Sequence, residues 1–425
     1  MKLHIENIAK IQNTEILIDG ITVIVGKNNV GKSTVGKALY CMFSALSDIE
    51  RKIARERVNY LRQAIYSLSF KVRREGKALF GIYAEKYALR IYDTWKENKK
   101  LSRDDVREML ISILHEIQPS PAADSQFADD VELYSSRVAD YLKVDDDQVI
   151  GQILTDTFRE VFNDQVNTLS APEHDGIVRL MIRNKELKAV FRNNECVDKV
   201  LDIDLLNKAV FIDDPSVMEG LSNVRKNTRS SMERTLVSYM REAQFVRPGE
   251  DVIERTLNKN KLKDIYSVIN EAVDGSFVER NGELCFQEKD HTYAIKLNNL
   301  SYGLKSFVQL KYLLERNILK RGDVLIFDEP EIHLHPQWQI LFARLVVLLQ
   351  REFELSVIVT SHSYFFVDAI DLYTQKYGTA STAHFYVAEE NSESASFHEV
   401  THDPEDLYLS TSDAANMLEQ LRDSM

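Results

Sequence analysis

The 425-residue chain is long enough for two or three domains, and its composition, with 44% hydrophobic and 28% charged residues, is that of a globular protein. The net charge of −13 argues against a protein that coats nucleic acid over its whole surface, although it leaves room for a local basic patch. The three cysteines fit neither a disulfide framework nor a zinc pattern. We find no signal-peptide pattern and no membrane-spanning run, so we expect a cytoplasmic protein with no membrane partner.

The first 46 residues show the pattern of three strands and a helix. Residues 2–7 and 14–20 alternate between polar and apolar side chains, whereas residues 21–26 form an almost continuous apolar run, which is typical of a strand buried on both faces. A helix is predicted to begin near Lys32. Its apolar stripe consists of Val35, Leu39 and Phe43.

A long segment of helical spacing follows, in which glycine is scarce. We predict a helical insertion over residues 47–170, interrupted at Pro119 and Pro121. Its first part, Arg51–Lys77, contains nine Lys or Arg residues against two Glu residues. Such a run is most often a solvated helix face, but it could also contact nucleic acid or an acidic partner.

Strand patterns return after the insertion. Residues 176–200 alternate like a hairpin with a turn near Asn184, and Lys208–Pro215 has the pattern of a strand that ends at a proline. Residues 216–272 have helical spacing again. The later predicted elements are a hairpin from 282–287 and 292–297, a helix ending near Ile318, a strand at 323–330, a helix at 337–353, a strand at 356–363, strands at 383–390 and 395–400, and a helix at 414–423.

These patterns predict an α/β head that is interrupted by helices. The predicted parts are residues 1–46 (head, N-terminal part), 47–170 (helical insertion), 171–215 (head strands), 216–272 (helical lobe) and 273–425 (head, C-terminal part).

The segment GKNNVGKST, between the third strand and the first helix, fits the phosphate-loop pattern G-x-x-x-x-G-K-[ST]. Glycines allow backbone N–H groups to curl around a phosphate, and the helix N-terminus adds partial positive charge. We therefore predict that Lys32 contacts the β- and γ-phosphates of ATP and that Ser33 holds Mg²⁺. The predicted nucleotide-binding residues of this loop are Gly26, Lys27, Asn28, Asn29, Val30, Gly31, Lys32, Ser33 and Thr34.

A buried strand that ends in acidic residues is the expected partner of this loop. In VLIFDEPEIHLHP (Val324–Pro336), we predict that Asp328 holds Mg²⁺ and that Glu329 accepts a proton from the attacking water. Alone, the segment would indicate only a strand with an acidic turn. The phosphate loop upstream favours the catalytic interpretation.

Three histidines lie close to these predicted strand ends. His362 follows an apolar strand that should end at the same edge of the sheet, so we predict that it hydrogen-bonds the γ-phosphate or the attacking water. His333 and His335 have H-x-H spacing but no third ligand nearby, which favours a role in shaping the turn over metal binding. We find no compact set of residues for a nuclease centre, and the segment after His362 is too short for a second sizeable catalytic domain.

The segment NNLSYGLKSFVQL (Asn298–Leu310) places Ser301 and Gly303 at the predicted start of a helix. With the phosphate loop, FDEPEIHLHP and TSHS, it resembles the ABC-type ATPases of the SMC/RecF/OLD group. Within that group the chain is most similar to the stand-alone ATPase subunits, of the AAA_15 or AAA_21 kind, of bacterial antiphage systems such as Septu, PARIS and retron-linked operons. The resemblance covers the head and implies a mixed sheet around the phosphate loop plus antiparallel strands, with a large helical insertion.

In that family two heads sandwich each ATP. The resemblance implies that Ser301 and Gly303, with a helix dipole behind them, contact the γ-phosphate of ATP held by a second copy. Tyr302 departs from the family's common form, which has two consecutive glycines after the serine. The glutamine that couples nucleotide state to the helical lobe is not identified, although Asp213 and Asp214 occupy the position where such a coupling loop could lie.

These features predict a slow ATP hydrolase, with Glu329, His362 and Lys32 as catalytic residues, that forms ATP-bridged dimers or assemblies of dimers. By resemblance, it would regulate a separate effector, a nuclease or a toxin, in antiphage defence. The alternative is a RecF-like DNA-repair ATPase with Arg51–Lys77 as its DNA track. A transporter motor is disfavoured by the long interval between phosphate loop and signature, and an inactive scaffold by the presence of every catalytic residue type.

Overall fold

The computed structural model separates into two compact units. Met1–Ser47 and Leu154–Met425 form the first, which we call the head unit, and Asp48–Ile153 form the second, the helical unit. The structure describes residues 1–72, 80–98, 101–117, 125–221, 230–242, 252–391, 394–401 and 421–422. Within these ranges, no helix has the length and apolar character needed to cross a bilayer.

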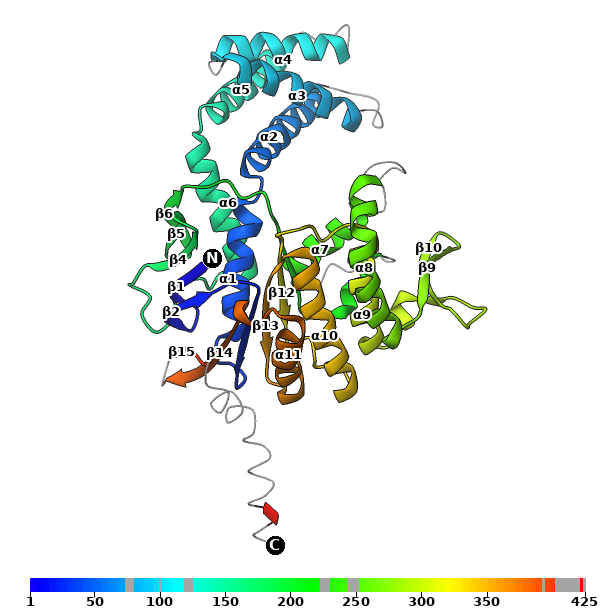
Figure 1. The fold of residues 1–425 in the computed structure, drawn as a ribbon. Helices are drawn as coiled ribbons and strands as arrows, with labels where there is room; N and C mark the ends of the chain where they lie inside the picture. Colours follow the sequence, from blue (N-terminus) through cyan, green and yellow to red (C-terminus); the bar gives the residue numbers. More distant parts are fainter. Residues whose placement is uncertain are drawn as a thin grey trace. The chain divides into compact units, whose positions relative to one another are not determined.

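The centre of the head unit is a mixed β-sheet (Figure 1). One part of it is parallel: β3 (Ile21–Gly26), β7 (Ala209–Ile212), β12 (Val324–Asp328), β13 (Ser356–Ser361) and β14 (Ala383–Asn391). The remaining strands each have an antiparallel neighbour: β1 (Lys2–Ile8), β2 (Ile11–Leu17), β4 (Gly176–Ile182), β5 (Lys185–Arg192), β6 (Glu195–Leu201) and β15 (Ser394–Glu399). The order across the sheet is β6-β5-β4-β1-β2-β15-β14-β3-β13-β12-β7. The predicted α/β fold, with a mixed sheet around the phosphate loop and additional antiparallel strands, is therefore confirmed.

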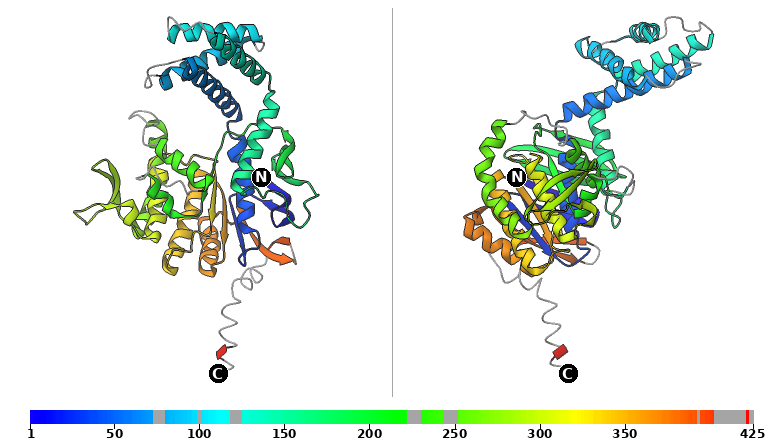
Figure 2. Two further views of the ribbon diagram at one scale, coloured as in Figure 1. Left: turned by 180° about the vertical axis from the view of Figure 1, so that it is seen from behind. Right: turned by 90° about the vertical axis from the view of Figure 1, so that its right-hand side faces the viewer.

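Helices cover both faces of the parallel strands (Figures 1 and 2), which explains why β3 is buried along its whole length. The helices of the head unit are α1 (Lys32–Leu46), α7 (Ser231–Glu242), α8 (Val252–Ala272), α9 (Tyr302–Glu315), α10 (Pro336–Phe353) and α11 (Tyr364–Tyr377), with short 3₁₀ turns η1 (Pro215–Leu221), η3 (Leu297–Asn299) and η4 (Ala380–Thr382). Helix α1 packs closely on one face because Gly36 has no side chain: a Cβ there would lie 2.9 Å from Ile326 Cγ2.

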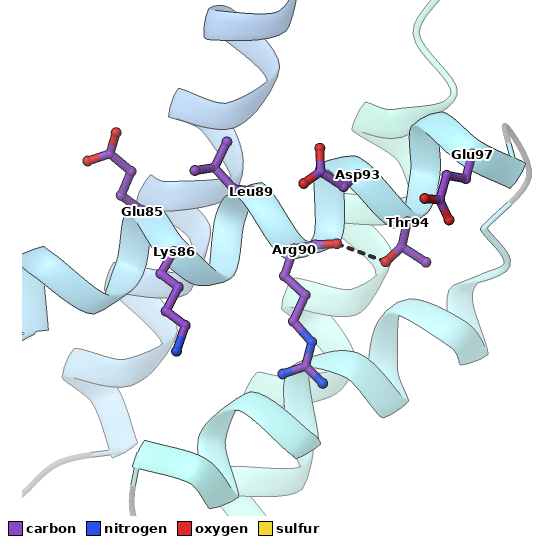
Figure 3. Close-up of a pocket in the computed structure, with 7 residues that line it drawn as sticks. All are labelled: Glu85, Lys86, Leu89, Arg90, Asp93, Thr94 and Glu97. Carbon is purple, nitrogen blue, oxygen red and sulfur yellow. Dashed lines mark hydrogen bonds between the residues drawn. The ribbon is translucent and has the colours of Figure 1, made fainter.

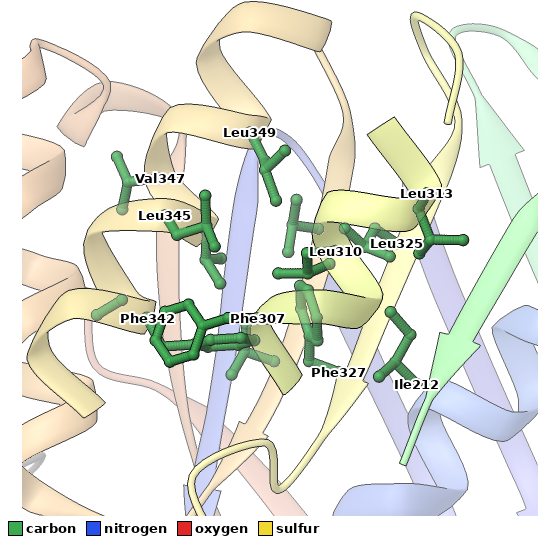
Figure 4. Packing of buried hydrophobic residues seen from close by; sticks show 14 of the residues in the cluster. Ile212, Phe307, Leu310, Leu313, Leu325, Phe327, Phe342, Leu345, Val347 and Leu349 are labelled. Carbon is green, nitrogen blue, oxygen red and sulfur yellow. The ribbon is translucent and has the colours of Figure 1, made fainter. Parts of the chain in front are cut away.

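The opposite face of the sheet carries the main hydrophobic core. Phe327 of β12 packs edge-to-face with Phe342 of α10, and Phe342 does so with Phe307 of α9 (Figure 4). Each such buried aromatic side chain contributes roughly 2–3 kcal/mol to stability. This packing fixes the positions of the strand ends relative to α9, where the predicted signature lies.

Two hairpin predictions need correction. Residues 176–200 form three strands instead of one hairpin, because Asn193 and Asn194, at φ 52° and 65°, make a second tight turn. The main partner of β10 (Glu283–Glu288) is β9 (Gly275–Arg280), across the tight turn at Asn281–Gly282. The predicted partner, residues 292–297, pairs with β10 only through the two-residue strand β11 (Ile295–Lys296).

Two helices differ from the sequence prediction. Helix α11 was not predicted, although its buried side chains recur at helical spacing in Phe366, Ile370 and Thr374. The predicted helix at 414–423 lies outside the described residues except for Leu421 and Arg422.

The helical unit contains α2 (Ile49–Val72), α3 (Phe80–Asn98), α4 (Arg103–Ile117), α5 (Ser125–Leu142) and the first residues of α6 (Asp146–Val161). Its boundary at Ile153 differs from the predicted residue 170. The reason is that the later turns of α6 pack on the head unit, where the buried Phe158 contacts Phe191 at 4.4 Å between ring centroids. The predicted breaks at Pro119 and Pro121 lie outside the described residues.

Candidate nucleotide-binding site

The phosphate loop joins the buried strand β3 to α1 through a backbone that requires glycine. At Gly26, with φ 150°, a Cβ would lie 2.4 Å from the carbonyl oxygen of Ala388 on the neighbouring strand β14. Asn29 and Gly31 adopt left-handed conformations, with φ 68° and 84°. No side chain caps the start of α1, so its first N–H groups are left to other acceptors.

The Lys32 ammonium group is buried beneath this loop. Its Nζ donates hydrogen bonds to the carbonyl oxygens of Gly26 (2.8 Å) and Lys27 (2.7 Å), and it lies 3.5 Å from Glu329 Oε1. Only 4% of Lys32 is exposed, so these partners replace the hydrogen bonds that water would make to it. The Lys32 ammonium group thus lies beneath the loop, at the position predicted for a lysine that contacts phosphate.

Ser33, Asp328 and Thr360 form a compact oxygen cluster at the ends of α1, β12 and β13. Both hydroxyl groups donate to Asp328 Oδ1, Ser33 Oγ from 2.9 Å and Thr360 Oγ1 from 2.5 Å. A hydroxyl and a carboxylate are hard oxygen ligands of the kind that Mg²⁺ prefers. Thr360 was not singled out by the sequence, because only its register opposite Asp328 reveals the contact.

The Glu329 backbone is strained, with φ 50°, which is unusual for a residue other than glycine. Its N–H is held by the carbonyl and hydroxyl oxygens of Thr360, each at 3.1 Å. The carboxylate lies between two cationic or potentially cationic groups, since its Oε1 is 3.6 Å from His362 Nδ1 as well as 3.5 Å from Lys32 Nζ. The sheet edge therefore brings together Lys32, Ser33, Asp328, Glu329 and His362.

Glu331 is a buried carboxylate beside this group and was not predicted. Its Oε1 accepts hydrogen bonds from Ser361 Oγ (2.6 Å) and from the backbone N–H of His362 (3.1 Å). Only 2% of Glu331 is exposed, and burial raises the pKa of its carboxyl group. Gln339 supports the same turn, because its Nε2 donates to the Leu334 carbonyl and its Oε1 accepts from Ser363 Oγ.

The predicted signature residues stand at the start of α9. Ser301 caps the helix by accepting a hydrogen bond from the Leu304 N–H at 3.3 Å. A Cβ on Gly303 would lie 3.1 Å from both the His333 carbonyl oxygen and the Trp338 ring. Within the described residues, no hydrogen bond or ion pair connects Ser301 or Gly303 to the phosphate loop.

The geometry also explains the departure at Tyr302. Its side chain is 46% exposed and lies against His333, with 4.7 Å between ring centroids. A bulky side chain therefore fits at the first position after the serine, whereas the second position is packed against the acidic turn. His335 occupies the N-cap position of α10 but makes no capping hydrogen bond through its side chain. In the described ranges, no group of three or more His, Cys, Asp or Glu side chains is arranged to hold a metal ion.

Asp213 and Asp214 follow β7 at the same sheet edge. Burial raises the pKa of Asp213, and the nearby Asp328 charge adds to this effect. Asp214 instead caps η1, where its Oδ1 accepts from the Ser216 N–H at 2.7 Å. A small cavity of about 20 Å³ lies between Asp213, Glu329 and Gln309 of α9. The Gln309 Nε2 is buried and has no partner among the described residues.

A wide-open surface hollow of about 630 Å³ lies along α3 in the helical unit (Figure 3). It is lined by Glu85, Lys86, Leu89, Arg90, Asp93, Thr94 and Glu97. These side chains all come from α3. None of them belongs to a glycine-rich loop or is a predicted site residue. The hollow is therefore not the candidate nucleotide site.

The chain is similar to a curated endonuclease, to solved SMC head domains and to an ATPase sequence family. Endonuclease GajA from Bacillus cereus (strain HuB5-5) is 22% identical in an alignment of 373 residues that covers 80% of this chain and 51% of GajA. The chain thus spans about half the length of this curated relative. An SMC head domain from Thermotoga maritima aligns over 94% of this chain and 98% of its own, at 11% identity and a TM-score of 0.37. An SMC head domain from Pyrococcus furiosus aligns over 99% of this chain and 98% of its own, at 12% identity and a TM-score of 0.34. The sequence family described as AAA ATPase domain (AAA_15) matches residues 1–367, and the chain therefore belongs to this family.

Proposed function

We propose that this chain binds and hydrolyses ATP and that ATP joins two copies of it. The observation that carries the proposal is the convergence of Lys32, Asp328, Glu329 and His362, from three separate segments, at the edge where β3, β12 and β13 end. Membership of the AAA ATPase domain family supports nucleotide binding in general.

The residues present fit ATP and Mg²⁺. Lys32 would exchange its contacts with the loop carbonyls for phosphate oxygens. The Ser33 hydroxyl and the Asp328 carboxylate, 2.9 Å apart, would hold Mg²⁺. When bound, the ion neutralises phosphate charge. Because Lys32 also lies 3.5 Å from Glu329, its turn toward phosphate would weaken that ion pair.

Glu329 is the proposed general base. As the oxygen of a water attacks the γ-phosphorus, Glu329 accepts its proton, and the bond from the γ-phosphorus to the β–γ bridging oxygen breaks to release ADP. His362, whose Nδ1 lies 3.6 Å from the Glu329 carboxylate, would contact the γ-phosphate or the water. The strained backbone at Glu329 supports a functional role, because such strain concentrates at active sites.

The second copy would supply Ser301 and Gly303. The start of α9 offers backbone N–H groups and a positive helix dipole to a γ-phosphate. Two chains would thus sandwich each ATP, and hydrolysis would release them, so that ATP acts as a two-state switch.

The test uses Glu329→Gln, which we expect to bind ATP while turning it over at least about 100-fold more slowly. Mass photometry should show dimers or larger assemblies of this variant in ATP and Mg²⁺, but monomers in ADP. Lys32→Ala is the matched control, since it should remain monomeric in both nucleotides. Equal association of both variants in ATP would contradict the proposal.

We further propose that the ATP switch regulates a separate effector, a nuclease or a toxin, in bacterial antiphage defence. The support is the likeness, at 22% identity, to Endonuclease GajA, together with the resemblance of the motifs to stand-alone ATPase subunits of such systems. The helical unit would be the surface that senses the trigger or docks the effector.

This role is tested in the native host with the neighbouring genes intact. Tagged Glu329→Gln should retain a stoichiometric partner in ATP and Mg²⁺, and the purified partner should show nuclease or toxic activity that changes with the nucleotide added. Recovery of DNA-recombination proteins, or metal-dependent cleavage of DNA or RNA by the purified chain alone, would overturn the role.

A specific observation favours a second candidate, a RecF-like DNA-binding ATPase. Arg51, Arg55 and Arg62 recur at helical spacing on the exposed face of α2, which continues to Tyr66, 51% exposed. Arg55 and Arg62 have no ion pair among the described residues, whereas Arg51 lies 3.7 Å from Asp48. Arginines without an ion pair among the described residues, on the same helix face as an aromatic ring, suit a nucleic-acid backbone and its bases.

The discriminating measurement is DNA affinity as a function of salt. If α2 is a DNA track, Arg55→Glu with Arg62→Glu should abolish binding and DNA-stimulated ATP turnover. Arg90→Glu is the matched control in the same unit, because Arg90 is already paired with Glu116 at 2.7 Å. Absent or salt-independent binding by the unmodified chain would rule out this candidate.

A further inference from the structure

The buried position of the Glu331 carboxylate is unfavourable for the stability of the fold. Its carboxyl is almost completely buried, and its Oε2 has no hydrogen-bond partner among the described residues. A buried carboxylate with an unsatisfied oxygen lowers stability unless a specific interaction requires it. The carboxylate takes no part in the proposed binding of phosphate or metal, so its retention needs another reason.

The hydrogen bonds of the Glu331 carboxylate come from the end of β13. Oε1 accepts from the Ser361 hydroxyl at 2.6 Å and from the His362 N–H at 3.1 Å, and it is 3.8 Å from His362 Nδ1. One oxygen therefore holds both the backbone of His362 and the residue before it, with the imidazole close by. A shift at this point would move the imidazole away from Glu329, which lies 3.6 Å from the same Nδ1.

Hydrogen bonds from the Gln339 side chain fix the turn that contains Glu331. Gln339 Nε2 donates to the carbonyl oxygens of Glu331 (3.4 Å) and Leu334 (3.0 Å), and Gln339 Oε1 accepts from Ser363 Oγ at 2.6 Å. The acidic turn after β12, the start of α10 and the residues after β13 are thus joined through two side chains, Glu331 and Gln339. Such outer contacts usually orient the groups that touch the substrate.

We propose that Glu331 is a positioning residue that fixes the backbone and imidazole of His362 relative to Glu329. The inference rests on the proposed ATPase function. Glu331 acts through His362 and has no contact with substrate. Its carboxylate anchors the strand end through Oε1, which also lies 3.8 Å from His362 Nδ1.

A double-mutant cycle tests this role. Glu331→Ala should lower kcat about 10- to 100-fold with little change in the dissociation constant for ATP, which is the usual range for an outer contact. In a His362→Ala background, the same substitution should have no further effect on kcat, because the group it positions is gone. Glu331→Gln keeps the acceptor oxygen and should recover most of the activity. Multiplicative losses in the double variant would contradict positioning.

Asp323→Ala is the matched control. Asp323 is also a buried carboxyl and accepts backbone N–H groups, from Lys208 at 3.2 Å and Lys320 at 2.9 Å, but it precedes β12 at the opposite end of the strand. We expect this substitution to lower thermal stability without changing kcat. An equal loss of kcat in Asp323→Ala and Glu331→Ala would assign both effects to general destabilisation and overturn the inference.

A second readout does not need ATP turnover. In protein labelled with ¹³C at histidine Cε1, the His362 signal, identified by its loss in His362→Ala, should shift in Glu331→Ala and stay in place in Asp323→Ala. An unmoved His362 signal in Glu331→Ala would refute the positioning role even if the chain hydrolysed no ATP. Absent turnover in the unmodified chain, with a shifted signal, would instead count against the proposed function alone.

Discussion

The two halves of the proposed ATP site, both present in each chain, differ in how their polar groups are satisfied. In the phosphate-loop half, the Lys32 ammonium donates to two loop carbonyls, and the Ser33 hydroxyl donates to Asp328. In the signature half, the donor to the Ser301 hydroxyl among the described residues is Leu304 of its own helix, and Tyr302 is 46% exposed. One half is assembled by the fold of a single chain, and the other presents its groups outward.

This difference indicates which binding partner would complete each half of the proposed site. The first half needs only a nucleotide, because its strands, register and helix hold the groups in place. In the second half, Gly303 is packed against its neighbours and Tyr302 is exposed. The N-terminus of α9 offers its N–H groups to an anion. A facing chain with bound ATP would satisfy it. The predictions below test this contrast, from the largest expected effect to the smallest.

The largest effect should come from removing the charge of the phosphate-loop half. Lys32→Ala deletes charge-assisted hydrogen bonds to phosphate and should weaken ATP binding by roughly 100-fold, about 2.7 kcal/mol. Isothermal titration calorimetry with ATP and Mg²⁺ measures the change. Lys2→Ala, which removes an exposed lysine paired with Glu15, is the control and should bind ATP normally. An unchanged dissociation constant in Lys32→Ala would place the nucleotide elsewhere.

The next effect concerns the division of the site between chains. Ser301→Asp keeps a good helix cap but adds a negative charge where the γ-phosphate should lie, so this variant and Lys32→Ala should each be inactive alone. Mixed in equal amounts, they should recover measurable turnover, up to about half that of the unmodified chain, because a mixed dimer holds one intact site of two. Steady-state phosphate release measures this recovery. No recovery on mixing, despite mixed dimers, would place both halves in the same chain.

A smaller effect separates the two residues after the signature serine. Gly303→Ala forces a methyl group against the His333 carbonyl and Trp338, which should cost about 1–3 kcal/mol and lower turnover. Tyr302→Gly removes an exposed ring and restores the family's common pair of glycines, so we expect a stability change below about 1 kcal/mol and faster turnover. Thermal unfolding and ATPase rates report both. A greater loss of stability from Tyr302→Gly than from Gly303→Ala would reverse this assignment.

The sequence predicted those parts of the site whose signals are local. The glycine spacing of the phosphate loop, the apolar strand before it and the helix after it lie in one continuous segment, and the structure has β3 and α1 on either side of that loop. Thr360 and Glu331 could not be found in this way. The Thr360 contact depends on the register that pairs Thr360 with Asp328, and the Glu331 contact depends on how the acidic turn folds toward β13.

Other differences have local causes as well. The Asn-Gly pair at 281–282 is a hairpin signal that the predicted pairing of residues 282–287 with 292–297 overlooked. The boundary of the helical unit was not predicted because α6 continues without a break from one unit into the other, so helical periodicity gives no sign of the change at Ile153.

The smallest effect is a pH-dependent gain in stability on removing the buried Glu331 carboxyl. Burial raises its pKa in the folded chain, so this group favours folding most below its unfolded pKa, and that contribution is lost as pH rises through the folded pKa. Glu331→Gln cannot lose a proton, so its unfolding free energy relative to the unmodified chain should rise as pH increases above 4.5, the ordinary pKa of a glutamate.

Urea unfolding, followed by Trp338 fluorescence in a Trp95→Phe background, reports this change for the head unit alone, because Trp95 and Trp338 are the two tryptophans of the chain. Glu15→Gln, at an exposed carboxylate, should show no such trend. If the unfolding free energy of Glu331→Gln relative to the unmodified chain stays constant or falls with pH, the hydrogen bonds from Ser361 and His362 offset the cost of burying the charged carboxylate. A rise would mean that the chain gives up stability to keep an anionic anchor beside His362, in contrast to the phosphate-loop half, where each charge has a partner.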